Sequence, residues 1–497
     1  MKLDLTPQDA WQPLPANAWN EAAARHLLRR AGWAAQPAEV DRLMKDGLAA
    51  SLDRLFPAKA NPMPEPRLIA NIEADQPGFA AKLRAADTRD QRQILQREQR
   101  ERQQQAVQDL SIKWLQFASL PENAVVEKWV FFLSDVYVIS QEKVQNTAHV
   151  YRFHETLRQG ALGRSPDLAK AVSRTPAMIQ YLDLQDSKTG TPNENFAREL
   201  FELFLLGEGN YTEQDIKEAA RAFTGYRQQP GGFRLVKNQH DTGPKTIFGK
   251  TGPFDGDDVI DLAFGLPAAG RFLPHEMVKF YLTDEGLPDS YLAELGSWWQ
   301  TTGYDLRLLA QRFFGSRLFF DPSFRGNYIK SPIQFYLGLV QDLNLNVAPF
   351  QRHALNALRL MGENPFRPPN VRGWVGGRLW INSGTLSARR QLVETLFAPI
   401  DEDTLNADEQ VQLVAARSAG LSNFTVTDER LQAMLKSMNP DQITARFLDY
   451  FLPVRVSETF RTNVRTFLAG DGAPKNDIER LRNTAVTLLQ SPEYQLC

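Results

Sequence analysis

The chain has 497 residues, of which 42% are hydrophobic and 23% are charged, a balance typical of a globular protein with a sizeable core. Its 57 Lys and Arg nearly cancel its 59 Asp and Glu, so nucleic acid and anionic membrane surfaces are not expected as partners. The single cysteine, Cys497, excludes an internal disulfide and a cysteine-based metal site.

The N-terminal residues MKLDLTPQDAWQPLP show no basic stretch followed by an apolar run, so they do not resemble a secretory signal. The longest apolar runs, near FELFLLG and WVFFL, are too short to span a bilayer. We therefore expect a cytoplasmic protein without a membrane span, or a periplasmic one if a signal has been removed.

Helical periodicity dominates the chain and predicts a mostly α fold, a large multi-helix array. Strand-like alternation is confined to 232–249, where two short β-prone runs flank a loop, so we expect a small β-hairpin excursion there. We expect an N-terminal extension (1–19), a helical core (20–400) and a C-terminal helical subdomain packed on that core (401–497). The predicted helices cover 20–31, 67–118, 122–140, 144–160, 166–185, 192–206, 213–224, 256–264, 273–282, 288–301, 304–315, 330–342, 348–361, 383–398 and most of 408–497.

The segment 190–226 carries the densest set of polar side chains at helical spacing. Thr191 is predicted to cap its first helix, with Glu194 three residues later as the partner in a capping box. The apolar stripe of this helix is expected to face the core. The opposite side then presents Asn195, Arg198, Glu199 and Glu202 on one strip of surface.

A second helix, capped by Thr212, follows and places Glu218 and Arg221 one turn apart. Carboxylates beside an arginine are typical of general acid–base machinery or of ligands for a divalent metal. A polar network that joins two helices, or a solvated helix face, uses the same residue types, and both interpretations stay open. No Glu-x-x-His pair, which would indicate a di-iron site, occurs here.

The next loop gathers His240, Asp241 and Lys245, and polar loop residues are packing residues less often than those of helices. These three side chains could bind an anionic group or share a proton. Alternatively, Asp241 closes a turn and Lys245 lies exposed. Further on, Asp255 is expected to cap a helix, with Asp258 three positions later as its partner.

Trp374 and Trp380 bracket a glycine-rich turn in the segment 368–392. Paired tryptophans could form a platform for a sugar or a peptide, and buried anchors of an irregular loop are the alternative. The six histidines are scattered without a His-x-x-x-His pair, so a three-histidine zinc centre is not expected. The cofactor is therefore unknown, and a divalent metal on the carboxylates remains an option.

Four blocks occur in the order PNENFARELFELF, GNYTEQDIKEAARAFTGY, HDTGPKTIFGKTGPFDGDDVID and PPNVRGWVGGRLWINSGTLSARR, after an opening RHLLRRAGWAAQPAEVDRL. With these blocks the chain resembles the bacterial domain-of-unknown-function 1800 family from about residue 20 to the C-terminus. The family has no established reaction. Its members often carry export signals and are encoded beside a phosphatase-like companion family, so the resemblance implies a two-protein system outside the cytoplasm.

One block departs from the family pattern. Within VEKWVFFLSDVYVIS at 126–140, the family typically has His-Asn-His before an aromatic residue, whereas this chain has Ser134, Asp135 and Val136 before Tyr137. If the histidines of the family hold a metal or move protons, this chain has lost or changed that capability. The resemblance therefore implies that this chain is a divergent member of the family.

The leading hypothesis is an enzyme with a polar pocket on 193–221, roofed by the loop 238–246, that acts on a peptide or protein. Glu199, Glu202 and Glu218 would supply acid–base or metal-binding carboxylates, and His240 would move a proton. Substrate binding would fall to Asn195, Arg198, Arg221, Asp241, Lys245, Trp374 and Trp380. The competing hypothesis is a non-catalytic scaffold that docks a companion protein through the same groove. The oligomeric state stays open.

Overall fold

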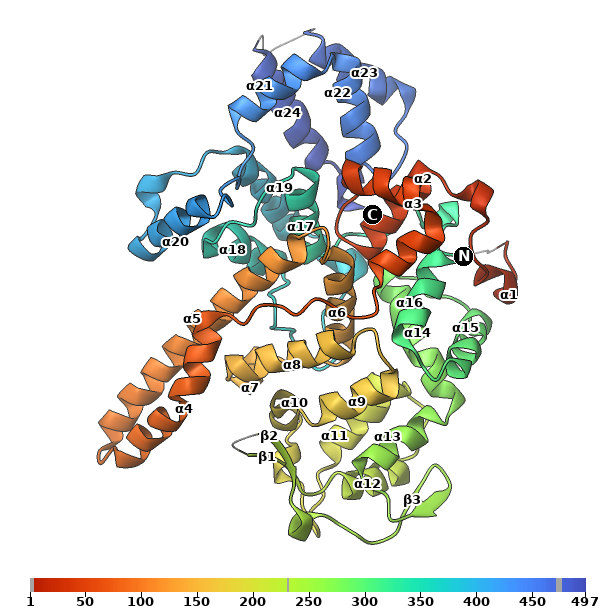
Figure 1. Ribbon diagram of the computed structural model, residues 1–497, viewed down its shortest axis with the longest axis vertical. Helices are drawn as coiled ribbons and strands as arrows, with labels where there is room; N and C mark the ends of the chain where they lie inside the picture. Colours follow the sequence, from red (N-terminus) through yellow and green to blue (C-terminus); the bar gives the residue numbers. More distant parts are fainter. Residues whose placement is uncertain (1–3, 230–231, 471–475) are drawn as a thin grey trace.

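The computed structural model describes residues 4–229, 232–470 and 476–497, and helices make up most of them (Figure 1). The predicted mostly α fold is therefore confirmed. The N-terminal helices are α1 (Pro7–Ala10), α2 (Glu21–Ala31), α3 (Pro37–Leu55), α4 (Arg67–Ala85), α5 (Arg89–Ser119), α6 (Ala124–Val136), α7 (Gln141–Val144) and α8 (Thr147–Gly160).

Helix α5 joins a projecting arm to the core. With α4 it forms an arm that leaves the body of the molecule (Figure 1). The helix begins in a capping box, in which Thr88 Oγ1 accepts the N–H of Gln91 and the Gln91 side chain accepts the N–H of Thr88. Toward its C-terminal half, Leu110 and Trp114 are buried, so this part of the helix belongs to the core.

Helix α6 lies in the centre of the core, and all of its residues except Asp135 are buried. Its carboxylate at Glu127 is held by Arg158 of α8, with Nε–Oε1 and Nη2–Oε2 distances of 2.6 and 2.7 Å. Trp114 Nε1 donates a third hydrogen bond to this carboxylate, at 3.0 Å. A buried ion pair of this kind is tolerated because each polar atom has a partner.

The middle of the chain supplies most of the remaining helices. They are α9 (Ser165–Ser173), α10 (Pro176–Tyr181), α11 (Glu194–Glu199), α12 (Glu213–Ala222), α13 (Gly256–Phe264), α14 (Pro267–Tyr281), α15 (Asp289–Thr301), α16 (Leu306–Gly315), α17 (Pro332–Asp342), α18 (Gln351–Met361) and α19 (Ser383–Phe397). Helix α11 continues directly as a π-helical segment, Leu200–Leu205.

Two small antiparallel hairpins interrupt the helices. Strand β1 (Tyr226–Gln229) pairs with β2 (Gly232–Leu235), and β3 (Lys245–Ile247) pairs with β4 (Lys250–Gly252). The predicted excursion at 232–249 is thus confirmed as two short hairpins, with the His240 loop between them.

Two of the three N-cap residues predicted from the sequence cap their helices in the structure. Thr212 with Asp215, and Asp255 with Asp258, form the expected capping boxes. The prediction that Thr191 caps the next helix was wrong. Asn193 is the cap, because its side chain accepts the N–H of Asn195, while Thr191 pairs with Lys188 in a tight turn.

The C-terminal helices are α20 (Ala407–Ser418), α21 (Asp428–Ser437), α22 (Pro440–Arg446), α23 (Glu458–Leu468) and α24 (Asp477–Leu489). After α24 the chain returns to the core, where the N–H of Lys330 donates to the carbonyl of Gln495 at 2.8 Å. Cys497 is buried beside Tyr328. The proposed division at 19/20 and 400/401 stays a prediction.

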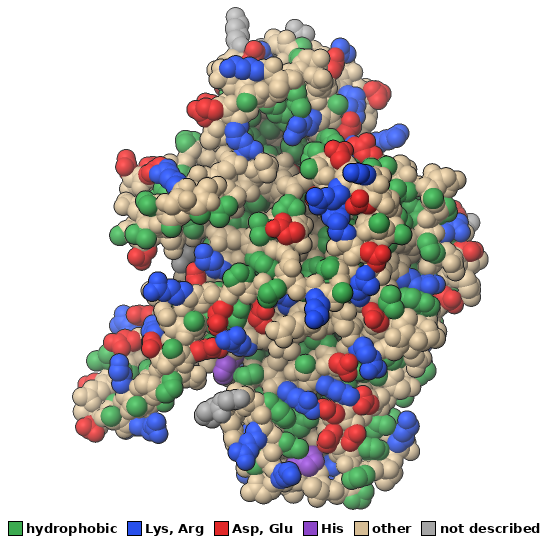
Figure 2. Space-filling model, in the orientation of Figure 1, with side chains coloured by type: hydrophobic (Ala, Val, Ile, Leu, Met, Phe, Trp, Pro, Cys, Tyr) green, Lys and Arg blue, Asp and Glu red, His purple; other side chains and the backbone are tan. Residues whose placement is uncertain are grey.

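Charged side chains of both signs are interspersed on the face shown in Figure 2. This agrees with the near-cancellation of charge in the sequence. Within the described part of the chain, no helix combines the length and the apolarity that a membrane crossing requires.

Candidate functional site

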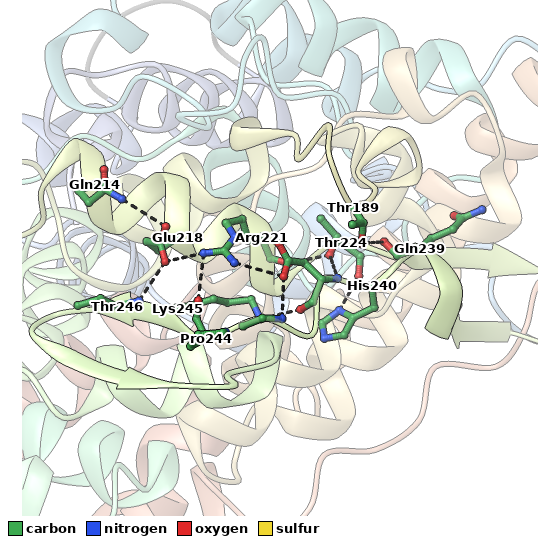
Figure 3. Close-up of polar contacts among 12 residues, drawn as sticks. Thr189, Gln214, Glu218, Arg221, Thr224, Gln239, His240, Pro244, Lys245 and Thr246 are labelled. Carbon is green, nitrogen blue, oxygen red and sulfur yellow. Dashed lines mark hydrogen bonds and ion pairs between the residues drawn. The ribbon is translucent and has the colours of Figure 1, made fainter.

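The predicted residues of α12 and the following loop form one ion-pair network (Figure 3). Arg221 binds Asp241 through Nε at 2.8 Å and Glu218 through Nη1 at 2.9 Å. Backbone groups also bind these carboxylates: Glu218 accepts the N–H of Thr246 at 3.0 Å, and Asp241 accepts that of Gly243 at 2.9 Å. The Gln214 side chain donates to Glu218 as well, at 3.3 Å. These contacts fasten β3 and the loop to α12.

His240 and Lys245 also hold the loop in place. His240 Nδ1 lies 2.9 Å from the carbonyl oxygen of Thr224, to which it donates. Lys245 is 1% exposed, and its Nζ donates to the carbonyls of Asp241 and Gly243 at 2.7 and 3.1 Å. Lys245 Nζ and His240 Nδ1, which were predicted to act on a substrate, are therefore engaged with backbone carbonyls.

The predicted site residues of the helical segment 193–206 contact two different parts of the molecule. Arg198 makes two 2.8 Å contacts with Glu213 on α12, and Asn195 Nδ2 donates to the carbonyl of Leu182 at 3.4 Å. Glu202 instead faces Arg372, with 2.7 Å between Oε1 and Nη2, and accepts the Tyr211 hydroxyl at 3.1 Å. Burial and the charge of Glu202 raise the pKa of Glu199.

The predicted carboxylates are thus distributed over two networks. Among the described residues, no hydrogen bond or ion pair joins Glu199 or Glu202 to Glu218 or His240. Glu202 lines a cavity of about 590 Å³, together with Glu208, His275, Arg372 and Asp135. The π-helical turn that carries Glu202 is a geometry often found at functional sites.

A larger cavity, of about 1000 Å³, adjoins this one, and we call it the central cavity because the core helix α6 forms one of its walls. The two share the lining residues Asp135, Val136, Glu276, Lys279 and Arg372. Helix α6 presents one face to the larger cavity, at i, i+3, i+4 and i+7: Lys128, Phe131, Phe132 and Asp135. Helix α14 and the turn after it do the same with Glu276, Lys279, Phe280 and Thr283.

The glycine-rich segment 371–380 closes the third side of the central cavity. Trp374 and Trp380 both line it, so the predicted tryptophan pair lies at this cavity. Trp380 is 8% exposed, and Trp374 packs on Phe131 with 5.5 Å between the ring centroids. Both rings therefore line the cavity, while Trp374 also packs on the core, and the anchor and platform interpretations stay predictions.

Two glycines shape this segment around two carboxylates. Gly373 (φ +80°) and Gly377 (φ +65°) have left-handed backbone conformations that favour glycine. A Cβ atom at Gly373 would overlap the carboxylate of Asp135, and one at Gly377 would overlap that of Asp284. Only glycine lets the backbone approach both aspartates this closely.

The deep carboxyl groups of the central cavity have unusual proton affinities. Burial raises the pKa of Asp135 to about 7, against the opposing effect of the N–H of Trp374, which donates to Oδ1 at 3.0 Å. Burial also raises the pKa of Glu363 to about 7, although its carboxylate accepts the N–H of Ile333 at 2.7 Å; the charge of Asp135 adds to the rise. An ionised Asp135 therefore disfavours the ionisation of Glu363.

Lys128 completes the polar part of the cavity wall. Burial lowers the pKa of its ammonium to about 7. Its Nζ donates to the carbonyl of Gly32 at 2.8 Å, at the C-terminus of α2, and lies 5.4 and 5.7 Å from the ring centroids of Trp33 and Tyr281. Groups with shifted pKa values that line a cavity are candidates for proton transfer.

A metal centre has no obvious ligand set in the described ranges. No group of three or more His, Cys, Asp or Glu side chains there is arranged to hold an ion. The chemistry that the visible residues can perform by themselves is proton transfer and hydrogen bonding.

Asp135, Lys128, Asp284 and Glu363 were not among the predicted site residues. A signal was present for the first two, because α6 carries charged residues in an otherwise apolar helix, and those at 128 and 135 share one face. Asp135 also lies in the block that departs from the family pattern. No comparable local signal marks Glu363 or Asp284.

Comparison with protein families identifies one match. The model described as "Protein of unknown function (DUF1800)" matches residues 26–496. Comparison with curated proteins and with solved structures gives no match.

Proposed function

The chain belongs to the DUF1800 family, and from its central cavity we propose that it is an acid–base enzyme acting on a bound peptide. Asp135 and Glu363 are the proposed proton-transferring residues. The observation that carries this proposal is that both carboxyl groups line one cavity and have pKa values of about 7. Catalytic groups work best when their pKa lies near the working pH.

The pKa values of about 7 indicate how the two carboxyl groups would share the proton-transfer steps. Near pH 7 one carboxyl group can hold a proton while the other is ionised, so one can donate as the other accepts. Asp135 is the better placed for contact with substrate, because Glu363 is 2% exposed while Asp135 is only partly buried. Glu363 is oriented by the N–H of Ile333, and Asp135 by that of Trp374.

A peptide fits the composition of the cavity wall. Aromatic rings, carboxyl groups and hydrogen-bonding groups alternate around it, which suits a chain with both apolar and polar parts. The volume of about 1000 Å³ is at the upper end for small-ligand sites, and the second cavity beyond Arg372 extends it. In this proposal Glu202 and Arg372 border the extension, whereas Glu218, Arg221 and His240 hold the loop.

The test compares four forms of the full chain on a peptide mixture of random sequence, analysed by mass spectrometry. Wild type and the surface control Asp167→Asn are expected to hydrolyse a subset of peptides. One carboxyl group takes a proton from the attacking water while the other protonates the leaving amine, so two lighter products replace each cleaved peptide. Asp135→Asn and Glu363→Gln keep the hydrogen-bond acceptor but cannot ionise, and are expected to lose about 100-fold or more of the rate. Unchanged peptides with wild type, or full activity in both variants, would overturn the proposal.

A second candidate is a scaffold that docks a companion protein. Its support is the exposure of two apolar side chains on the cavity-lining segment, Val375 (56%) and Leu379 (68%). The double variant Val375→Asp/Leu379→Asp should then lose a partner that co-purifies stoichiometrically with wild type. If the variant keeps such a partner, or wild type has none, the scaffold candidate fails.

A further inference from the structure

Most of the cationic side chains that line the central cavity already have partners, whereas several of its carboxyl groups do not. Two of its cations are already paired with carboxylates: Arg372 binds Glu202 and Glu208 at 2.7 and 3.0 Å, and Lys279 Nζ lies 3.6 Å from Glu276. Lys128 is directed to the carbonyl of Gly32. Among the described lining residues, this leaves Arg378 as the cation without an ion pair or a backbone acceptor.

The carboxyl groups show the opposite pattern. Four lining residues, Asp135, Asp284, Glu285 and Glu363, have no ion pair within 4.0 Å among the described residues. Asp284 and Glu285 are exposed at the cavity, whereas Glu363 is 2% exposed. Glu363 is buried without a cationic partner, which is costly, and a cationic ligand would offset that cost. Asp284 and Glu285 are open to such a ligand, and Arg30 and Arg378 act on the Asp284 carboxylate only from beyond ion-pair distance.

The aromatic residues of the wall favour the same ligand. Trp374 and Trp380 flank the stretch in which Gly377 passes over Asp284, and Tyr328 lies on the same cavity. Aromatic faces attract ammonium and guanidinium groups, most strongly where water is partly excluded. The cavity therefore combines the two elements that bind an organic cation, a surplus of carboxylates and aromatic rings beside them.

From this juxtaposition we propose that the central cavity recognises the cationic side chain of a lysine or arginine in a peptide, with Asp284 and the Trp374–Trp380 segment as its specificity determinants. The inference rests on the proposed function for the peptide nature of the ligand. The aliphatic part of such a side chain would lie against Trp374 and Trp380, and its charged end would reach the carboxylates. A small free amine shares the same cationic chemistry, and the test distinguishes the two sources.

The experiment measures binding to the full chain by calorimetry, with three acetylated and amidated pentapeptides. Each has four alanines around a central lysine, norleucine or glutamate, and n-butylammonium serves as the free amine. The lysine peptide is expected to bind at least tenfold more tightly than the norleucine peptide, and the glutamate peptide more weakly still. The Asp284→Asn variant should reduce this preference to less than threefold, because it removes one exposed carboxylate without altering the core.

The control is Asp167→Asn, which removes an exposed carboxylate of α9 that is not a lining residue of either cavity. It should keep the full preference. Equal binding of lysine and norleucine peptides, tighter binding of the glutamate peptide, no binding at millimolar concentration, or an unchanged preference in Asp284→Asn would each overturn the inference. Equally tight binding of n-butylammonium would overturn the assignment to a peptide.

These outcomes are separable from failure of the proposed function. Selective binding of the lysine peptide without any chemical change in peptides would leave the inference standing and remove the acid–base proposal. Turnover of peptides irrespective of their lysine and arginine content would support the acid–base proposal and remove the inference about a cationic side chain.

Discussion

The carboxylate of Asp135 accepts a hydrogen bond from the backbone N–H of Trp374, with 3.0 Å between oxygen and nitrogen across 239 positions of sequence. This bond connects the core helix α6 to the segment that closes the central cavity. It also gives Asp135 a fixed orientation while leaving its second oxygen free of protein hydrogen bonds among the described residues. A carboxyl group in this situation is positioned by the protein and remains available to a ligand.

The first prediction concerns the stability of Asp135→Asn. Because the pKa of Asp135 is raised from 3.8 to about 7 in the folded chain, the unfolded chain releases this proton first as the pH rises. The aspartate therefore lowers the free energy of unfolding progressively between about pH 4 and pH 7. Asparagine cannot ionise, so the variant should be more stable than wild type by about 1–3 kcal/mol at pH 8 and nearly equal to it at pH 4.

Thermal unfolding at pH 4, 6 and 8 measures this difference. Asp167→Asn is the matched control and should show no comparable change between these pH values. A variant that is less stable than wild type at pH 8 would show that the carboxylate is held there by a favourable interaction.

The second prediction compares two glycines with nearly the same backbone conformation. Gly373 (φ +80°) faces Asp135, whereas Gly209 (φ +81°) has nothing within 4 Å of the position that a Cβ would take. Alanine at either site carries the strain of a left-handed conformation, about 1 kcal/mol. Gly373→Ala must also displace the Asp135 carboxylate, so it should cost at least about 1 kcal/mol more and reduce turnover tenfold or more.

Unfolding midpoints and peptide turnover of the two variants test this expectation. Equal losses of stability and unchanged turnover in both variants would show that the close approach of Gly373 to Asp135 is unimportant.

The third prediction concerns the buried ion pair of the core. Arg158→Met leaves the carboxylate of Glu127, which is 1% exposed, without its cation, and should destabilise the chain by about 3–5 kcal/mol. Arg97→Met is the matched control, because Arg97 pairs with Glu101 on the projecting arm with 78% of its side chain exposed. Its effect should stay below about 1 kcal/mol. Denaturant unfolding of both variants measures the contrast, and similar losses would contradict it.

The features that follow from neighbouring residues could be predicted from the sequence. The capping boxes at Thr212 and Asp255, and the β-prone runs around 232–249, depend on contacts within a few positions. Even here Asn193, and not Thr191, caps the helix, because two polar residues on either side of Pro192 can each accept N–H groups of the first turn.

The central cavity could not be predicted in this way. Its parts meet through long-range contacts, such as that between Glu363, just after α18, and Ile333, at the start of α17, or that between Asp135 and Trp374. The dense charges of 193–221 led to the prediction of a polar pocket there, yet Arg198 and Arg221 neutralise several of those charges locally. In contrast, the apolar helix α6 carries only three charged residues, Glu127, Lys128 and Asp135, and the last two line the cavity.

The last prediction is the pH dependence of peptide turnover. If one of Asp135 and Glu363 donates a proton while the other accepts one, the active form is the singly protonated pair, whose population falls on both sides of pH 7. The rate at saturating peptide should therefore follow a bell-shaped profile with its maximum near pH 7. In Glu363→Gln the residual rate should retain only the limb that belongs to Asp135. Circular dichroism at each pH verifies that the chain stays folded, and a wild-type rate that is constant from pH 5 to pH 9 would exclude proton transfer by this pair, since neither carboxyl group could then control the rate.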